Sequence, residues 1–254
     1  NILMIEVIKV ESKKNVKDFV MFPFELYKDC EYWVPPIINE EIDAMDTNKN
    51  PVFKNAEAEF YLAYKENKIV GRIAAIVNWV EIEEQKKNKL RFGWYDTIDD
   101  VNVSKALMDK VLEFGKSRKL EFVDGPVGFS NMDKAGLLIE GYDELNTMIT
   151  WYHYPYQKEH LNKLGFSKLA EWVEYKIKIF SADEAPEKVK KFSKIIQKRY
   201  NLKVVNFKST KEIIPYVDKM FELLNVTYSN LQTYVTIKQY QIDFYKEKFI
   251  KYIH

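Results

Sequence analysis

The sequence EFVDGPVGFSNMDKAGLLIEGYDE, residues 121–144, sets the strictest backbone requirements in the chain. It is followed closely by WYHYPYQKEHLNKLGF at 151–166. Five of the eight glycines lie within this region, between Gly125 and Gly165. Glycine is used where the backbone takes a positive φ or lies very close to another group. We therefore expect residues 121–166 to form the floor and rim of a site.

The composition is that of a globular protein with a balanced surface. The chain has 254 residues, enough for one large or two smaller domains, and 39 basic and 38 acidic residues. The near-neutral charge gives no general attraction to nucleic acid or to an anionic membrane. A single cysteine, Cys30, excludes an internal disulfide, and three histidines argue against a metal site. No signal peptide or membrane span is visible, so we expect a cytoplasmic protein, and the oligomeric state is not predicted.

Hydrophobic periodicity predicts an α/β domain before residue 121. The expected elements are a strand at 4–10, a helix at 15–28, a hairpin of strands at 59–64 and 69–79, a strand at 90–97 and a helix at 103–116. A strand at 121–123 should lie parallel to the preceding strand, because crossover connections are right-handed.

The pattern after residue 166 predicts one more strand and then the beginning of a second domain. Residues 170–179 alternate like a strand, and a polar joint follows at 181–186. The tail predicts a helix at 187–200, a strand at 202–207 and helices at 213–228 and 237–252. It repeats the strand and two helices that open the chain. We therefore expect one domain over residues 1–180 and the partial start of a second over 181–254.

This order of elements resembles the GNAT (acyl-CoA N-acyltransferase) superfamily. The resemblance rests on DCEYWVPP (29–36), NAEAEFYLAYKENKIVGR (55–72), GPVGFSNMDKAGLLIEGYD (125–143) and YPYQKEHLNKLGF (154–166). More narrowly, these four pieces are similar to an uncharacterised bacterial group with two tandem GNAT-like domains. The resemblance implies a mixed, splayed central sheet flanked by helices.

The resemblance also implies a reaction, the transfer of an acyl group from acyl-CoA to the amine of a small molecule or peptide. Acyl-CoA would bind between the strands at 90–97 and 121–123. Backbone N–H groups near Phe92, Trp94 and Tyr95 would hold the thioester carbonyl. The pyrophosphate would lie at the start of the helix at Val103, where an anion is stabilised.

Two departures from the GNAT pattern raise an alternative. The loop TIDDVNV at 97–103 has no glycine and carries Asp99 and Asp100 where a polyanion would bind. The usual position of the tyrosine that protonates the leaving thiolate is occupied by Leu161. The alternative is a non-catalytic ligand-binding or interaction module that has lost CoA binding. A charged tRNA as the acyl donor is a third hypothesis, against which the neutral charge argues.

The distinctive residues near the glycines supply candidates for chemistry. Glu140 ends an apolar run and could act as a general base if it is semi-buried, because burial raises the pKa of a carboxyl group. His153 could move a proton, and Tyr154 or Tyr156 could replace the missing tyrosine. The predicted substrate-binding residues are Ser130, Asn131, Asp133 and Tyr152.

Each candidate has a structural alternative. Ser130 to Asp133 could instead serve a turn and cap a short helix over 134–140. The aromatic cluster could be packing, and Glu140 a surface acid. Asp96, Asp99 and Asp100 could be active-site acids at the end of a strand or could cap the helix that follows. Arg72 could meet a carboxylate or phosphate, or be a solvated strand residue.

Overall fold

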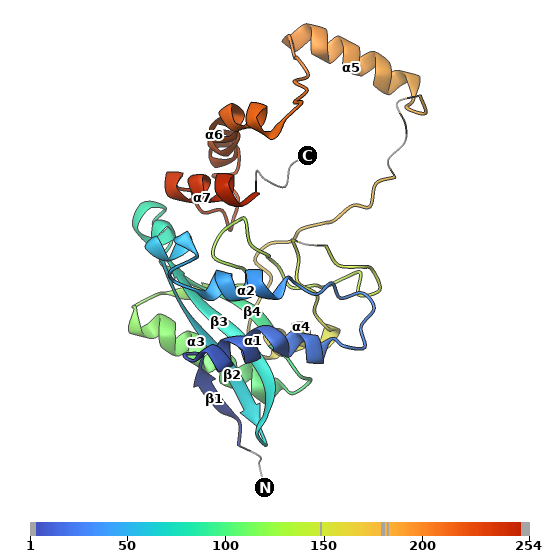
Figure 1. Cartoon of the computed structure of the whole chain (residues 1–254). Helices are drawn as coiled ribbons and strands as arrows, with labels where there is room; N and C mark the ends of the chain where they lie inside the picture. The colour runs from blue at the N-terminus through green and yellow to red at the C-terminus, as the bar shows by residue number, and fades with distance from the viewer. Residues whose placement is uncertain (1–3, 148, 179–180, 182, 250–254) are drawn as a thin grey trace.

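The computed structural model describes residues 4–147, 149–178, 181 and 183–249. A five-stranded sheet with the order β1-β2-β3-β4-β5 forms its centre (Figure 1). The strands are β1 (Glu6–Lys9), β2 (Ala56–Lys65), β3 (Lys68–Asn78), β4 (Lys89–Thr97) and β5 (Phe122–Asp124). Neighbouring strands are antiparallel except β4 and β5, which are parallel as predicted.

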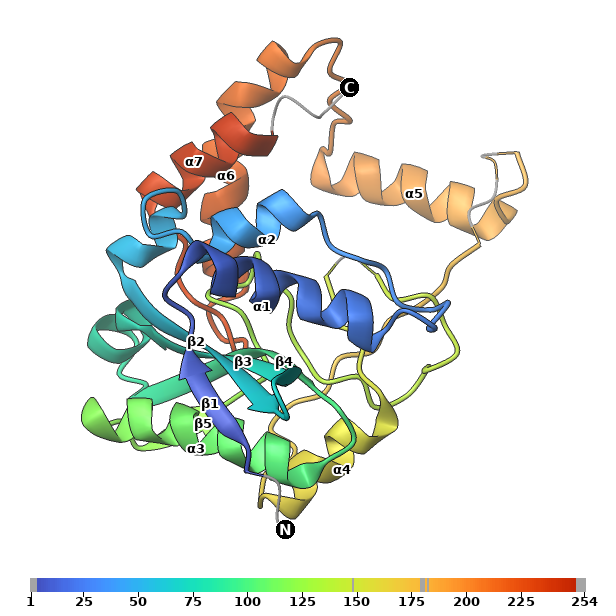
Figure 2. The same ribbon diagram turned by 60° about the horizontal axis from the view of Figure 1, so that its bottom comes forward.

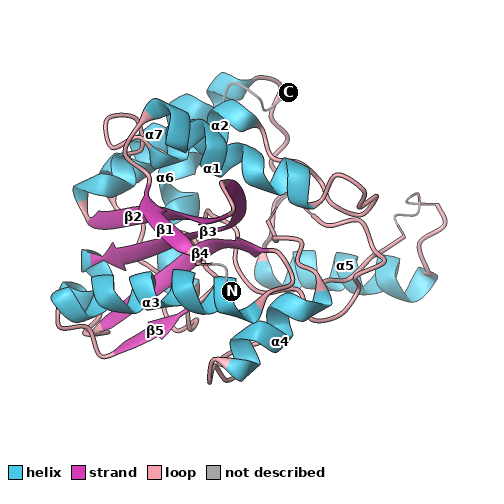
Figure 3. Ribbon diagram, turned by 90° about the horizontal axis from the view of Figure 1, so that it is seen from below, coloured by secondary structure: helices cyan, strands magenta, loops and turns pink. Residues whose placement is uncertain are grey.

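Helices cover both faces of this sheet (Figure 3). Helix α1 (Lys13–Leu26) and helix α2 (Ile38–Met45) lie on one face, and α3 (Val101–Ser117) with α4 (Pro155–Lys163) on the other. Each face has its own apolar core, one built around Phe19 of α1 and one around Leu107 of α3. Because both faces are covered, most of β3 is buried rather than alternating. The predicted mixed α/β architecture, a mixed central sheet flanked by helices, is confirmed.

The hairpin between β2 and β3 follows from its turn. Glu66 and Asn67 both take positive φ values, 51° and 62°. Two such residues form the tight turn whose twist matches that of the flanking strands. The hairpin predicted from residues 59–79 is therefore confirmed, but it begins three residues earlier, at Ala56, and ends one residue earlier, at Asn78.

A β-bulge interrupts β4 in the middle of the sheet. Arg72 pairs with Asp96 and Ala74 pairs with Gly93, so β4 has one residue more than β3 in this interval. Trp94 lies at the bulge with φ 47°, in the left-handed region that a tryptophan rarely adopts. A bulge bends the strand and redirects the residues that follow it. It sets the direction of Asp96, which the site uses.

Two predicted strands are wrong. Residues 170–178 and 202–207 have no strand partner in the described structure, and Ile179 lies outside the described residues. Their apolar side chains are exposed, for example Trp172 and Val204. An alternating segment becomes a strand only when a neighbouring edge satisfies its backbone groups. Neither segment pairs with an edge of the sheet in the described structure.

The predicted helices of the tail are present. They are α5 (Glu187–Tyr200), α6 (Thr210–Thr227) and α7 (Gln239–Phe249), and residues 250–252 of the last predicted helix lie outside the described part. Figures 1 and 2 show α5 well away from the sheet, while α6 and α7 lie near it. The division into a complete and a partial domain stays a prediction.

The segment before α7 is attached to the first part of the chain through backbone carbonyls. Arg91 donates to the Thr233 carbonyl at 2.8 Å, Gln85 to that of Tyr234 at 3.0 Å, and Asn131 to that of Val235 at 3.1 Å. Arg91 is itself held by Glu81 through two hydrogen bonds of 2.7 and 2.8 Å. The N-terminal half of β4 is thus occupied by structural contacts, and its C-terminal half contains the candidate site.

Candidate functional site at the end of β4

A small cavity lies at the C-terminal end of β4, on the face covered by α1. The space in which the centre of a water-sized group fits has a volume of about 10 Å³. This is room for about one water-sized group. The lining residues are Pro23, Tyr27, Trp33, Pro36, Glu41, Arg72, Asp96, Lys134, Trp151 and Tyr152.

Asp96 is the buried carboxylate of this cavity. Arg72 Nε donates to Asp96 Oδ2 at 2.7 Å, and both side chains are almost fully buried. The two residues are direct partners in the register of β3 and β4, which explains why their side chains meet. Arg72 also donates to the carbonyl of Phe19 at 2.9 Å. The prediction that Arg72 meets a carboxylate is confirmed, and the alternative of a solvated strand residue is wrong.

Tyr27 completes the cluster from the end of α1. Its hydroxyl donates to Asp96 Oδ1 at 2.7 Å. Burial, and then the charge of Asp96, raise the pKa of Tyr27 well above its usual range, so the hydroxyl stays protonated. Its ring lies between the rings of Trp33, Tyr152 and Tyr154, at centroid distances of 5.4, 5.6 and 5.1 Å. We define Tyr27, Asp96 and Arg72 as the inner cluster.

Side chains from the start of α4 cover the outer edge of β4 beyond the bulge. Gln157 Nε2 donates to the Tyr95 carbonyl at 3.2 Å, and the Tyr156 hydroxyl donates to the Thr97 carbonyl at 2.7 Å. Gln157 Oε1 accepts from the backbone N–H of Tyr154 at 2.8 Å and from the Tyr27 hydroxyl at 3.3 Å. Gln157 therefore joins the inner cluster to the edge of the sheet.

His153 is buried beside the same edge. Burial lowers the pKa of His153 to about 4, partly offset by the charge of Asp96 and by a hydrogen bond with the Tyr95 backbone. Its Nδ1 accepts a hydrogen bond from the backbone N–H of Leu138 at 3.3 Å. The imidazole is therefore neutral near pH 7, and its ring nitrogens are engaged by backbone groups.

The start of α3 is occupied by the chain's own carboxylates. Asp100 is the N-cap and accepts from the backbone N–H of Asn102 at 3.0 Å, as the structural alternative predicted. Lys65 bonds to Asp100 at 2.9 Å and lowers the pKa of that carboxyl group. These groups lie where a GNAT protein would place the pyrophosphate, so this helix start does not fit a polyanion.

A chain of hydrogen bonds also ties α3 to α4. Tyr95 donates to Ser104 at 2.7 Å, Ser104 lies 2.8 Å from His160 Nδ1, and His160 Nε2 lies 3.1 Å from Asp99. Ser104 is fully buried. The two helices are thus joined by side chains along this line of hydrogen bonds.

The predicted cofactor-binding side chains are mostly core residues. Phe92, Tyr95 and Val103 are buried on the α3 face, and only their backbone could contact a ligand. The indole of Trp94 donates to Glu41 at 2.7 Å. Leu161 is part of the same α3-face core, so the structure gives it a packing role.

The predicted substrate residues divide into two groups. Tyr152 lines the cavity, and its hydroxyl donates to the Tyr142 carbonyl at 2.9 Å. Asp133 accepts from the backbone N–H of Ser130 at 2.8 Å, and Asn131 donates to Val235. These last three residues serve a turn and the attachment of the tail, and none of them lines the cavity. The short helix expected over 134–140 is wrong, since the described backbone there is not helical.

Glu140 is exposed, which agrees with the alternative of a surface acid rather than with a semi-buried base. Tyr154, Tyr156 and His153 lie together beside β4, as the pattern WYHYPY indicated. The sequence did not identify Tyr27, Gln157, Glu41 or Lys134. Burial lowers the pKa of Lys134, partly offset by the charge of Glu41. No local motif marks these four residues, because they come together only through the fold.

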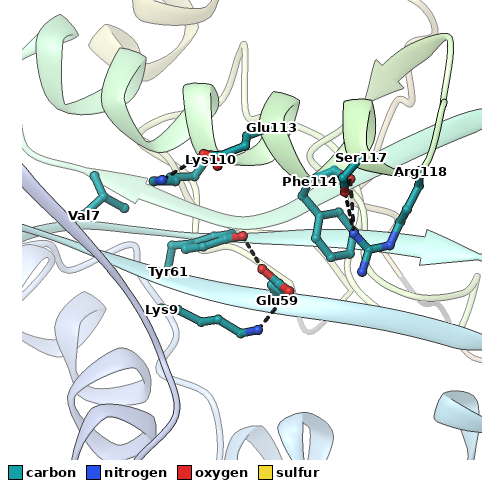
Figure 4. Close-up of a pocket in the computed structure, with 9 residues that line it drawn as sticks. All are labelled: Val7, Lys9, Glu59, Tyr61, Lys110, Glu113, Phe114, Ser117 and Arg118. Carbon is teal, nitrogen blue, oxygen red and sulfur yellow. Dashed lines mark hydrogen bonds and ion pairs between the residues drawn. The ribbon is translucent and has the colours of Figure 1, made fainter.

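A second and larger groove lies on the opposite side of the sheet, beside α3 (Figure 4). Its volume is about 330 Å³. Tyr61 donates to Glu59 at 2.5 Å, and Lys9 bonds to Glu59 at 2.8 Å. We define Tyr61, Glu59 and Lys9 as the outer cluster. Because the groove's charges are paired with one another, it presents no strong field to a charged ligand.

Two general properties of the described residues bear on function. No group of three or more His, Cys, Asp or Glu residues in the described ranges is placed to hold a metal ion. Among the helices that the structure describes, none has the length and apolarity needed to cross a membrane.

Comparison with known proteins gives relatives of the sequence and neighbours of the fold. No protein-family model matches the chain. Protein YghO of Escherichia coli (strain K12) is 28% identical over 214 residues, which cover 83% of this chain and 53% of that protein. The bacterial ceramide synthase of Caulobacter vibrioides (strain NA1000 / CB15N) is 26% identical over 174 residues, 68% of this chain and 45% of that protein. The chain spans about half the length of these curated relatives.

Solved structures of acetyltransferases are similar to part of the chain, at low TM-scores and low sequence identity. A predicted acetyltransferase with acetyl-CoA from Clostridium acetobutylicum has a TM-score of 0.43 and 15% identity, covering 68% of this chain and 96% of that one. An aminoglycoside acetyltransferase from an uncultured soil metagenomic sample, in complex with sisomicin, has a TM-score of 0.40 and 16% identity, covering 70% and 97%. The sheet of this chain is an antiparallel meander of β1 to β4 with a bulge in β4 and a parallel β5.

Proposed function

We propose that this protein is an N-acyltransferase that transfers an acyl group from acyl-CoA to an amine held at the inner cluster. The observation that carries the proposal is the bulge of β4 at Trp94, two residues before the buried Asp96. The bulge redirects the backbone of β4 beside the cavity, where the Asp96 carboxylate would accept a proton. Acyl transfer needs a hydrogen-bond donor that stabilises the developing oxyanion and a group that accepts the proton of the amine.

The donor side would use the backbone of residues 92–95. A backbone N–H at the bulge would donate to the thioester carbonyl and stabilise the tetrahedral intermediate. The pantetheine arm would need the edge of β4 that Gln157 and Tyr156 now cover, so these side chains must move when the donor binds. The phosphates would have to bind away from Asp100, which occupies the start of α3.

The acceptor is a small-molecule amine, and the curated relatives narrow the first choice. One of them is a ceramide synthase. A ceramide is the amide of a fatty acid and a long-chain amino alcohol, so a long-chain amino alcohol is the acceptor to test first. The aromatic rings of Trp33 and Tyr152 in the cavity wall suit an ammonium group and the methylene groups beside it.

The test is product formation by the purified chain. The chain is incubated with acetyl-CoA or palmitoyl-CoA and with sphinganine, butylamine or, as the matched control, butanol. We expect an amide by mass spectrometry and one equivalent of free thiol for each amide, with no product from the alcohol. The absence of amide with every donor and amine would contradict the proposal.

A second function, a non-catalytic binding module, is favoured by the covered edge of β4 and by the carboxylates at the start of α3. It is distinguished by calorimetric titration with CoA, acyl-CoA and sphinganine. Binding of the amine without binding of either CoA species would favour the module. Saturable binding of acyl-CoA would count against it.

A further inference from the structure

The inner cluster joins a guanidinium and a tyrosine hydroxyl to one carboxylate. Arg72 holds Asp96 Oδ2 and Tyr27 holds Asp96 Oδ1, each at 2.7 Å. All three side chains line the cavity, where an amine would meet them. Asp96 and Arg72 are both about 3% exposed, so their geometry is fixed by packing rather than by solvent.

We propose that Tyr27 and Asp96 form the proton-accepting pair for the amine, with Arg72 as the positioning residue that orients Asp96. This inference rests on the proposed acyl transfer and adds the residues that carry out its proton transfer. The ligand class is a primary amine whose nitrogen approaches the Tyr27 oxygen from the cavity.

The other candidates for this role are engaged elsewhere. His153 Nδ1 accepts from Leu138, and the ring also bonds to the Tyr95 backbone, so it has no lone pair free for an amine. The Tyr152 and Tyr156 hydroxyls donate to backbone carbonyls. Glu140 is exposed and does not line the cavity. The Tyr27 hydroxyl instead donates a hydrogen bond to the Asp96 carboxylate, and its oxygen can accept from an amine.

The proposed step conserves atoms and charge. The amine nitrogen attacks the thioester carbonyl and forms the N–C bond. One proton passes from the nitrogen to the Tyr27 oxygen while the Tyr27 proton passes to Asp96 Oδ1. The C–S bond then breaks and its electron pair leaves with sulfur as the thiolate. The Tyr27 hydroxyl gives its proton to the thiolate and takes back the proton on Asp96. The products are the amide and the free thiol.

The pair has a matched control in the outer cluster. Tyr61 donates to Glu59 as Tyr27 donates to Asp96, and Lys9 takes the place of Arg72. Tyr27→Phe and Tyr61→Phe each remove one hydroxyl from a tyrosine–carboxylate pair. Asp96→Asn keeps the shape of the side chain and removes its capacity to take a proton.

The experiment compares these variants in the acyltransferase assay with sphinganine and palmitoyl-CoA. General-base catalysis contributes about 10²–10⁴-fold, so we expect kcat to fall by about this factor in Asp96→Asn and by a smaller factor in Tyr27→Phe. We expect Tyr61→Phe to stay within about twofold of wild type. The rate measured in mixtures of H₂O and D₂O should indicate two protons in motion in wild type and one in Tyr27→Phe, a readout that a purely structural role would not change.

Three outcomes distinguish a failure of the proton-accepting pair from a failure of the proposed function. Wild-type turnover with an unchanged kcat in folded Asp96→Asn overturns the pair and leaves the acyltransferase function in place. If Asp96→Asn does not fold, the proton count in Tyr27→Phe decides in the same way. If the wild type makes no amide with any donor, both the proposed function and the pair are overturned.

Discussion

The inner and outer clusters contain the same three kinds of group in two different surroundings. Each joins a tyrosine hydroxyl, a carboxylate and a cation, with distances of 2.7 and 2.7 Å in the inner cluster and 2.5 and 2.8 Å in the outer one. The side chains of Arg72 and Asp96 are 4% and 5% exposed, whereas those of Lys9 and Glu59 are 44% and 25% exposed. The chemistry is shared, and burial decides what each cluster can do.

Burial changes both the energy and the accessible reactions of such a cluster. In the outer cluster, water screens the ion pair and competes for each hydrogen bond. In the inner cluster, the carboxylate depends on its two partners, and a ligand that enters must interact with them directly. A proton can therefore be directed along one path in the inner cluster, while the outer cluster exchanges protons with solvent.

The largest expected difference between the two clusters is the loss in free energy of unfolding when the cation of each cluster is removed. Arg72→Met leaves Asp96 buried and unpaired, which should reduce the free energy of unfolding by about 3–5 kcal/mol. Lys9→Met breaks an exposed pair and should cost about 0–1 kcal/mol. Urea denaturation of both variants measures the difference. Equal losses in the two variants would show that burial is not what distinguishes the clusters.

The second difference concerns pH, because a histidine lies beside the inner cluster. The pKa of His153 is lowered from 6.5 to about 4 by burial, so below pH 6.5 the unfolded state binds more protons and the native state loses stability. The loss should reach about 3 kcal/mol by pH 4. In the outer cluster, burial raises the pKa of Glu59, but Lys9 and Tyr61 outweigh it and lower the pKa overall, so its loss begins only below pH 4.5.

The measurement is the free energy of unfolding at intervals from pH 7 to pH 4, for wild type and His153→Gln. We expect the variant to be less stable at pH 7 and to lose less between pH 6.5 and pH 4. A parallel decline in both proteins would rule out His153 as the source.

The smallest difference concerns salt. Raising the ionic strength from 0.1 to 1 M shortens the screening length from about 10 Å to about 3 Å. The coupling energy of Lys9 and Glu59 in a double-mutant cycle should fall by a few tenths of a kcal/mol, whereas that of Arg72 and Asp96 should stay nearly constant. A salt-sensitive inner pair would indicate that water reaches Asp96 freely.

Local patterns predicted the scaffold better than the site. The hairpin, the long helix α3 and the parallel β5 follow from periodicity and turn residues within short windows. The inner cluster does not, because Tyr27 is 69 residues from Asp96 and 130 from Gln157. Arg72 was ambiguous from sequence, since a charged residue in a strand is usually solvated, and only the register with Asp96 decides its role.

The glycine-rich stretch shows the same limit at closer range. Lys134, Trp151 and Tyr152 of this stretch line the cavity. Some side chains predicted to bind substrate or act as a base have other roles. Ser130 to Asp133 serve a turn, and Glu140 faces solvent. The alternation at 170–178 likewise indicated a strand, but a pattern cannot supply the neighbouring edge that a strand requires.

The side chain of Gln157 has a consequence for the order in which two substrates would bind. Its amide holds the Tyr95 carbonyl with one end and accepts from the Tyr27 hydroxyl with the other. An amine that engages Tyr27 removes one of the bonds that orient this amide, and so weakens the cover on the strand edge that the donor needs. Occupancy of the acceptor pocket would then favour entry of the thioester, and steady-state kinetics would show compulsory order with the amine first.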